Sequence, residues 1–167
     1  MSLDADINCL IHQEEVLRFT AINEQVAWDL GTQMRQSAVE QKLPLVIDIR
    51  IGDRLLFYTA LPGTSKDNYE WVRRKVRTVM RFEKCSYRVG REHEKKNIVF
   101  AVARGINPMK YALAGGGFPI HVKGTGVVGC VTVSGIPQRQ DHSFVAENLS
   151  RCLGVDYSKI ALAPEAA

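Results

Sequence analysis

The residues of this chain that could do chemistry are two cations near its middle and a group of glycines, with one acid, further on. The cations lie in EWVRRKV, residues 70–76, and the glycines lie in AGGGFP, residues 114–119, and VSG, residues 133–135. Glycine amides and the positive end of a helix can together hold an anion. We therefore expect a site for a small anionic ligand formed by Arg74, Lys75, Gly116, Gly117, Gly135 and Asp141. The alternative is that these glycines only allow a strained connection and tight packing.

The histidines are the other candidates for chemistry. Heme needs an axial ligand and an apolar slot, and His121 and His142 are candidate ligands together with His12 and His93. Strand alternation places His121 on a polar face, where it could equally be a solvated side chain. His142 follows Asp141 in the first turn of a predicted helix and could act as an acid or base. No metal site is expected, because the four cysteines lie far apart without a CxxC pair.

The segment GTGVVG, residues 124–129, matches the GxGxxG pattern of dinucleotide-binding proteins. That pattern holds a pyrophosphate only where its glycines follow a strand and begin a helix. Here it continues into VVGCVTVSG, whose β-branched residues favour a strand. We therefore interpret the first two glycines as a hairpin turn and Gly129 as a bulge or a close approach of another backbone.

The periodicity of apolar residues predicts the elements that position these groups. Helices are expected over residues 5–19, 20–42, 65–83, 86–93 and 137–154, and strands over 45–51, 54–61, 97–104, 118–123 and 127–134. Consecutive hairpins without crossover helices favour an antiparallel sheet. The expected fold class is α+β, with a largely antiparallel five-stranded sheet flanked by helices in a single domain over residues 1–167.

Composition and charge exclude several classes of protein. With 46% apolar and 24% charged residues, the chain is neither disordered nor fibrous. Residues 66–96 contain eleven cations and five acids, a net charge of +6 in a chain whose total is +4. No nucleic-acid partner is expected, because no known binding motif accompanies this charge. The alternatives are a solvated helix face or a surface for an acidic partner.

The start of the sequence and its cysteines bear on location. The opening MSLDADINCLI is acidic, and no apolar run reaches the length of a membrane span. We expect a cytoplasmic protein without a membrane partner. Its cysteines are then best explained as buried, reduced side chains.

Three stretches resemble an uncharacterised protein family of the heme-degrading domain superfamily, related to GlcG and HbpS. They are LPGTSKDNYEWVRRKVRTVMRF, GGGFPI and VGCVTVSGIPQRQDHSFVAENL, within a match from about residue 14 to 153. The most specific positions are Trp71 with Arg74 and Lys75, and Gly135 with Asp141. The resemblance implies an antiparallel sheet with helices on both sides and a closed homo-oligomer. The superfamily's description suggests heme as a possible cofactor, although heme chemistry is not general to its members.

Three functions are compatible with these observations. The first is a non-enzymatic binder of a small anionic molecule or heme, built as a homo-oligomer. The second is an enzyme on a small anionic substrate, using Lys75, Asp141 or His142. The third is an assembly or adaptor protein whose basic helix docks an acidic partner. Large aromatic side chains also favour subunit contacts, namely Trp28, Phe57, Tyr58 and Trp71. We rank the binding protein first, and the sequence leaves the other two open.

Overall fold

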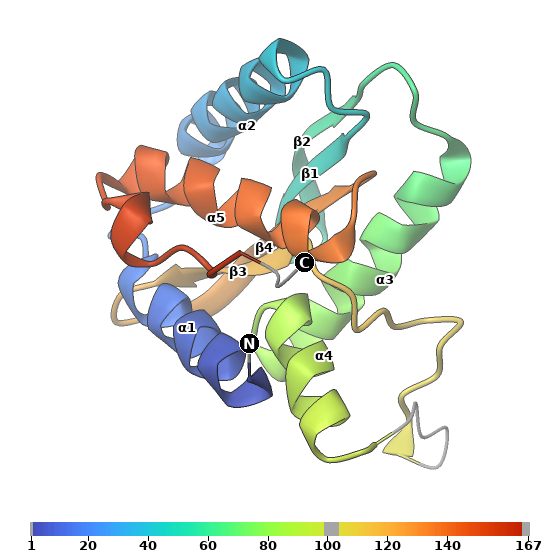
Figure 1. Cartoon of the computed structure of the whole chain (residues 1–167). Coiled ribbons are helices and arrows are strands. Elements are labelled where there is room, and N and C mark those ends of the chain that lie inside the picture. Colours follow the sequence, from blue (N-terminus) through green and yellow to red (C-terminus); the bar gives the residue numbers. More distant parts are fainter. Residues whose placement is uncertain (1, 99–103, 165–167) are drawn as a thin grey trace.

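The computed structural model describes residues 2–98 and 104–164 (Figure 1). Its helices are α1 (Leu3–Val16), α2 (Glu24–Glu40), α3 (Lys66–Phe82), α4 (Ser86–Lys95) and α5 (Gln138–Leu153). Its strands are β1 (Val46–Ile51), β2 (Arg54–Ala60), β3 (Gly117–Val122) and β4 (Gly126–Ser134). No helix in these residues is both long and apolar enough to cross a membrane.

The strands form one antiparallel sheet in the order β2-β1-β4-β3. The α+β class and the flanking helices are therefore confirmed, but the prediction of five strands is wrong for the described residues, which form four. The strand predicted over 97–104 falls largely on residues 99–103, outside the described part of the chain. In the observed sheet β1 pairs directly with β4, so both central positions are filled by the β-branched runs of these two strands.

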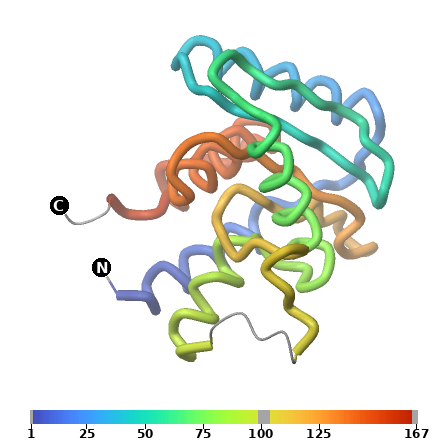
Figure 2. The backbone as a smooth tube through the Cα atoms, turned by 90° about the vertical axis from the view of Figure 1, so that its right-hand side faces the viewer, coloured from blue at the N-terminus to red at the C-terminus, as the bar shows by residue number. Residues whose placement is uncertain are grey.

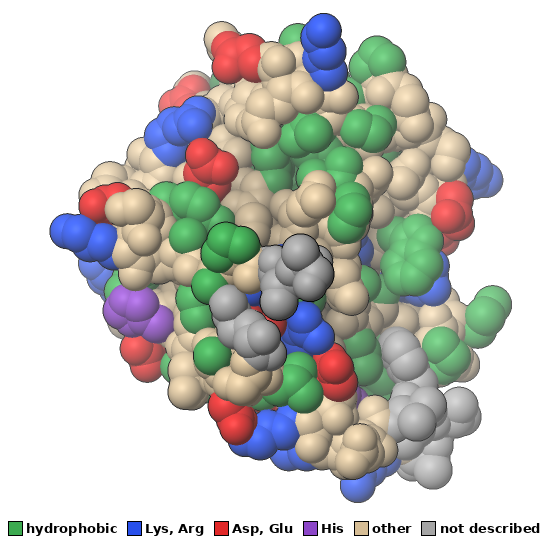
Figure 3. All heavy atoms as spheres, in the orientation of Figure 1, with side chains coloured by type: hydrophobic (Ala, Val, Ile, Leu, Met, Phe, Trp, Pro, Cys, Tyr) green, Lys and Arg blue, Asp and Glu red, His purple; other side chains and the backbone are tan. Residues whose placement is uncertain are grey.

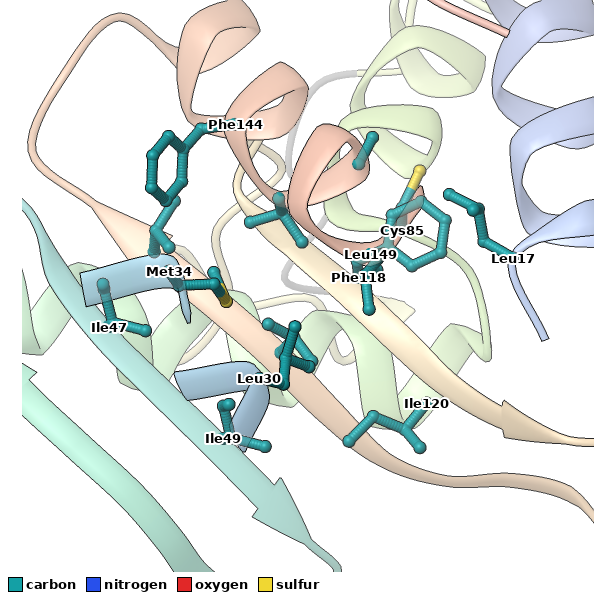
Figure 4. Packing of buried hydrophobic residues seen from close by; sticks show 14 of the residues in the cluster. Leu17, Leu30, Met34, Ile47, Ile49, Cys85, Phe118, Ile120, Phe144 and Leu149 are labelled. Carbon is teal, nitrogen blue, oxygen red and sulfur yellow. The ribbon is translucent and has the colours of Figure 1, made fainter. Parts of the chain in front are cut away.

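Helices cover both faces of the sheet (Figure 1). Helices α2 and α5 pack on one face and α3 packs on the other, while α1 and α4 pack against each other near β3. Figure 4 shows Ile49 of β1 beside Leu30 of α2, and Ile120 and Leu149 belong to the same buried cluster. Each of these side chains is at most 1% exposed. Burial of this apolar face fixes which face of the sheet each helix covers.

The GxGxxG pattern of residues 124–129 lies in the hairpin of β3 and β4. Residues 123–125 form the turn, and the chain continues as strand β4 instead of beginning a helix. A Cβ atom at Gly129 would lie 1.9 Å from the carbonyl oxygen of Arg50 in β1. Gly129 is thus required by the close approach of another backbone, as the sequence predicted.

The two ends of the chain meet at helix α5. The Arg139 guanidinium donates to both carboxylate oxygens of Asp6 in α1, at 2.8 and 3.0 Å, and to the carbonyl oxygen of Ala163 at 2.6 Å. The Gln13 amide of α1 donates to the carbonyl oxygen of Ile160 at 2.7 Å. Accordingly, α1 and the segment after α5 lie on the same side of the molecule (Figure 2).

Candidate functional site

The candidate site is a groove made of two adjoining pockets, which we call the Trp71 groove. Their volumes are about 260 and 370 Å³, and Trp71, Ala114 and Gln138 line both. The smaller pocket ends at Asp67 and Asn68, and its lining includes Lys75 and Asp141. The larger pocket is lined by Arg74 and by Pro108, Tyr111, Ala112 and Leu113. The indole of Trp71 therefore lies where the two pockets join.

Helix α3 positions the side chains of one wall. Ser65 precedes the helix in a capping box, with Asn68 accepting a hydrogen bond from the Ser65 backbone amide at 2.8 Å. Because residues three and four apart share a helix face, Trp71, Arg74 and Lys75 project to the same side. The Trp71 indole donates to Asp67 at 3.2 Å, which orients its ring.

A buried ion pair lies beneath the groove. The Lys75 Nζ atom donates to Asp141 Oδ2 at 2.8 Å and to the carbonyl oxygen of Val133 at 3.0 Å. Both charged side chains are 3% exposed. The structure thus brings together α3, β4 and α5 at the residues that the sequence singled out. It also shows that the lysine charge is neutralised by a residue of the same chain.

The predicted anion cradle is occupied by the carboxylate of Asp141. Its Oδ1 atom accepts from the Ile136 amide at 3.2 Å, and the Gly135 amide also hydrogen-bonds to this carboxylate. Gly116 has a φ of +122°, and a Cβ atom there would lie 2.8 Å from Lys75 Nζ. The Gly117 amide donates to the Ser86 hydroxyl at 3.0 Å instead of facing the groove. Lys75 and the amides of Gly135 and Ile136 therefore hold an internal anion, the Asp141 carboxylate.

Burial changes the proton affinities of this ion pair. Desolvation lowers the pKa of Lys75, and the nearby Asp141 opposes part of that shift. Desolvation raises the pKa of Asp141, opposed by Lys75 and the two backbone amides. The two pKa values are drawn toward each other, which reduces the free energy needed to move a proton from the lysine to the carboxylate.

Arg74 supplies the positive charge that faces the groove. Its guanidinium carbon lies 3.9 Å from the centroid of the Trp71 ring, within the range of a cation–π contact. One guanidinium nitrogen donates to the carbonyl oxygen of Pro108 at 3.3 Å. Among the described residues, no carboxylate forms an ion pair with it. Arg74 is thus oriented but not neutralised.

None of the four candidate histidines lines the groove. His142 is fully buried, with its Nε2 atom 2.7 Å from Gln13 Oε1 and its ring next to Tyr87 and Phe118. Burial and the nearby Arg139 charge lower the pKa of His142 to about 3. It is therefore a neutral core residue at physiological pH, not an exposed acid or base.

His121 lines a separate pocket of about 300 Å³ between the end of α3 and the β3–β4 hairpin. The same pocket is lined by Lys84 and Arg88. These cations form ion pairs with acids, Lys84 with Glu92 at 2.8 Å and Arg88 with both Glu92 and Glu14. The structure therefore does not place His121 with the Lys75 and Asp141 cluster.

The basic segment is balanced by contacts within the chain. Arg73 pairs with Glu70 at 3.2 Å, and Arg81 donates to the carbonyl oxygens of Arg104 and Gly105. On the face shown in Figure 3, cationic and acidic side chains are interspersed instead of forming a field of one sign. No group of three metal-ligating side chains occurs in the described residues.

Two residues that line the groove, Trp71 and Gln138, were not among the site residues predicted from the sequence. The sequence contained a signal for Trp71. It lies three residues before Arg74 and four before Lys75, so the three side chains share one face of the helix. The position of Gln138 depends on how the first turn of α5 packs on the loop containing Ala114. That contact is not encoded in a local pattern.

Comparisons with known proteins agree with this fold. Residues 22–150 match the family model described as haem degrading protein HbpS-like. A UPF0303 protein of Mesorhizobium japonicum is 43% identical over 166 residues, covering 99% of both chains.

Two solved structures are also similar. The crystal structure of the Ybr137w protein gives a TM-score of 0.78 at 28% identity, covering 89% of this chain and 87% of that chain. The crystal structure of a PduOC complex with heme gives a TM-score of 0.67 at 15% identity, covering 81% of this chain and 97% of the other. The second likeness is one of fold alone.

Proposed function

This chain belongs to the HbpS-like family of haem degrading proteins, and we propose that it is a non-enzymatic binding protein for a small anionic molecule. The ligand lies in the Trp71 groove, with a flat apolar part against the indole and an acidic group at Arg74. The supporting observation is the position of Trp71, which is 36% exposed and lines both pockets. The guanidinium of Arg74, which has no ion-pair partner among the described residues, lies 3.9 Å from the centroid of the Trp71 ring.

The chemistry of the groove limits the ligand. The larger pocket combines Arg74 with the side chains of Tyr111 and Leu113, which suits a molecule with one anionic group and an apolar body. The smaller pocket ends at the carboxylate of Asp67, which repels a second anionic group. A multiply charged phosphate ester is therefore disfavoured relative to an aromatic monocarboxylate.

Heme is bound by one structural neighbour, and its fit to this chain can be judged from the side chains. Heme needs an axial donor in an apolar slot. None of the described residues lining the groove is a histidine, cysteine or methionine, and the phenol of Tyr111 lies under the Arg81 guanidinium. His142 is buried against Gln13, and His12 is exposed on α1. The pockets of His121 and His93 are each lined by several charged residues, and His93 Nδ1 lies 2.7 Å from the Val89 carbonyl oxygen. These residues do not fit heme, so the proposed ligand is an organic anion without iron.

The test uses the fluorescence of Trp71. Because Trp28 and Trp71 are the two tryptophans of the chain, a Trp28→Phe variant reports on the groove alone. Benzoate, naphthoate, inorganic phosphate and hemin are titrated, with thermal shift as a second readout. We expect quenching and a raised melting temperature with the aromatic carboxylates but not with phosphate. Hemin should give no Soret band typical of histidine ligation.

Arg74→Gln should weaken binding of the aromatic carboxylate at least about tenfold, the loss of a charge-assisted contact. Arg77→Gln, an exposed arginine one turn further along α3, is the matched control and should leave affinity unchanged. The proposal would be rejected if no aromatic carboxylate bound, or if both variants weakened binding equally.

An enzyme remains the second candidate because of one observation. The pKa values of Lys75 and Asp141 are shifted toward each other at the lining of the smaller pocket, as in a pair that exchanges a proton. Turnover of a small carboxylate that is lost in Lys75→Met, under conditions where circular dichroism shows that the variant is folded, would favour this function over simple binding.

We also propose that the protein acts as a homo-oligomer in the cytoplasm. Support for self-association comes from large apolar side chains on the surface, chiefly Trp28, Leu55 and Tyr58. Such residues are typical of subunit contacts.

A further inference from the structure

The two edges of the sheet differ in how they are covered. At the β3 edge, Phe19 forms a parallel bridge with Val122, its amide donates to the His121 carbonyl oxygen at 2.8 Å, and β3 contains Pro119. Proline and a covering segment both prevent an edge strand from pairing with another chain. The β3 edge is therefore closed to further pairing.

The β2 edge has none of these features. In the described part of the chain, no segment pairs with the outer side of β2. The strand, RLLFYTA, contains no proline, no lysine and no acid, and its one charge is Arg54 at its first position. The strand carries a bulge at Leu56, because the neighbouring residues Ile49 and Arg50 of β1 pair with Phe57 and Leu55. The rest of this uncovered edge, from Phe57 to Ala60, is a template for pairing with another strand.

Both faces beside this edge are apolar. On the side facing α3, Leu55 and Tyr58 are 47% and 42% exposed. On the side facing α2, Trp28 is 57% exposed and contacts Phe57 edge-to-face at a centroid distance of 5.7 Å. A Cβ atom at Gly31 would lie 2.3 Å from the Phe57 ring, so this ring is packed directly on the α2 backbone. The surface around β2 is thus preformed.

We propose that a second copy of this chain pairs with β2, so that two β2 strands run antiparallel across a twofold axis and join the two sheets. This inference rests on the homo-oligomer of the proposed function and is independent of the Trp71 groove. Antiparallel pairing of one strand with itself satisfies the free backbone groups of both copies in one isologous contact. It brings the Phe57 and Trp28 rings of each copy toward those of the other.

Charge favours a second copy as the occupant. In an antiparallel pair the two Arg54 side chains lie at opposite ends, so no like charges face each other across the contact. Each Arg54 also keeps its ion pair with Glu24 at 2.9 Å. An acidic or basic partner strand would find no complementary charge along the rest of β2.

The test compares two double variants of the full chain that each add two positive charges. Leu55→Lys with Tyr58→Lys changes the β2 surface, and Val39→Lys with Met109→Lys changes exposed apolar residues elsewhere. All four positions are exposed, so both variants should fold, as checked by circular dichroism. Molar mass is measured by sedimentation velocity and light scattering, and amide exchange is measured over residues 54–60. Aromatic carboxylate binding is followed in the same samples.

The wild-type mass should be an even multiple of the 18.7 kDa chain. The β2 variant should have half that mass and faster amide exchange in β2, and the control should match the wild type. A wild-type monomer, an odd number of subunits, or a β2 variant of unchanged mass would overturn the proposal. Groove binding that persists in a dissociated variant separates this outcome from failure of the groove proposal.

Discussion

Removing one member of the buried ion pair should be among the most destabilising changes in this protein. Lys75→Met leaves the carboxylate of Asp141, 3% exposed, without the ammonium that lies 2.8 Å away. Losing one partner of a buried pair costs on the order of 3 to 5 kcal/mol of unfolding free energy. Because Asp141 keeps the hydrogen bond from the Ile136 amide, we expect a cost near the lower end, about 3 kcal/mol.

The assay is urea unfolding at pH 7 followed by circular dichroism, in a double-mutant cycle. Asp141→Asn removes the charge but keeps an oxygen that can accept from the Ile136 amide. The double variant Lys75→Met with Asp141→Asn therefore leaves no uncompensated charge and should recover about 2 kcal/mol relative to the sum of the single variants. Slopes of unfolding free energy against urea should be unchanged, because the folded surface stays the same.

The matched control is Arg73→Met on the same helix. Its partner Glu70 is 3.2 Å away, and the two side chains are 44% and 45% exposed. An exposed pair of this kind contributes less than about 1 kcal/mol. The reasoning would be refuted if Lys75→Met cost no more than Arg73→Met, or if the effects of the single variants simply added in the double variant.

Three further predictions concern other buried contacts. Neutral His142 contributes stability that is present above pH 6.5 and is lost as pH falls toward its folded pKa of about 3. The loss is about 1.4 kcal/mol per pH unit, so His142→Asn should flatten the acid dependence of the urea midpoint, and an unchanged slope would contradict this. Asp6→Asn should lower the melting temperature by several degrees in calorimetry, because it removes the negative charge of a carboxylate that accepts two hydrogen bonds from the buried Arg139 guanidinium. Gly129→Ala should prevent folding or cost more than about 2 kcal/mol in urea, since its methyl group would meet the Arg50 carbonyl oxygen at 1.9 Å, and wild-type stability would refute that contact.

Local sequence patterns were sufficient to predict most of the helices and strands. The four-residue repeat from Ile22 and the acids after Ser65 predicted α2 and α3, and the two-residue alternation predicted the hairpins. The start of α2 was misplaced, because Asn23 caps the helix through the Val26 amide at 2.9 Å. The order of the sheet could not be predicted, since β1 pairs with β4 about eighty residues later. The single domain over residues 1–167 stays a prediction.

For the candidate site, too, the sequence predicted some features and could not predict others. Glycine placement and charge identified Lys75, Asp141 and Gly116 as neighbours. The sequence could not show that the Asp141 carboxylate turns back onto the amides before its own helix. Nor could it show that His142 is buried, because Gln13, which covers it, comes from the opposite end of the chain.

The contacts of Arg139 and Gln13 have a consequence for how the protein is made. Helix α1 is synthesised well before its polar anchors, Arg139 and the Ile160 carbonyl, which lie 133 and 147 residues after the α1 residues that they contact. Contacts so distant in sequence form late. We expect α1 to complete its docking only after these anchors have been synthesised, so that the nascent chain exposes part of the apolar surface around Leu10 and Leu17 to chaperones until then.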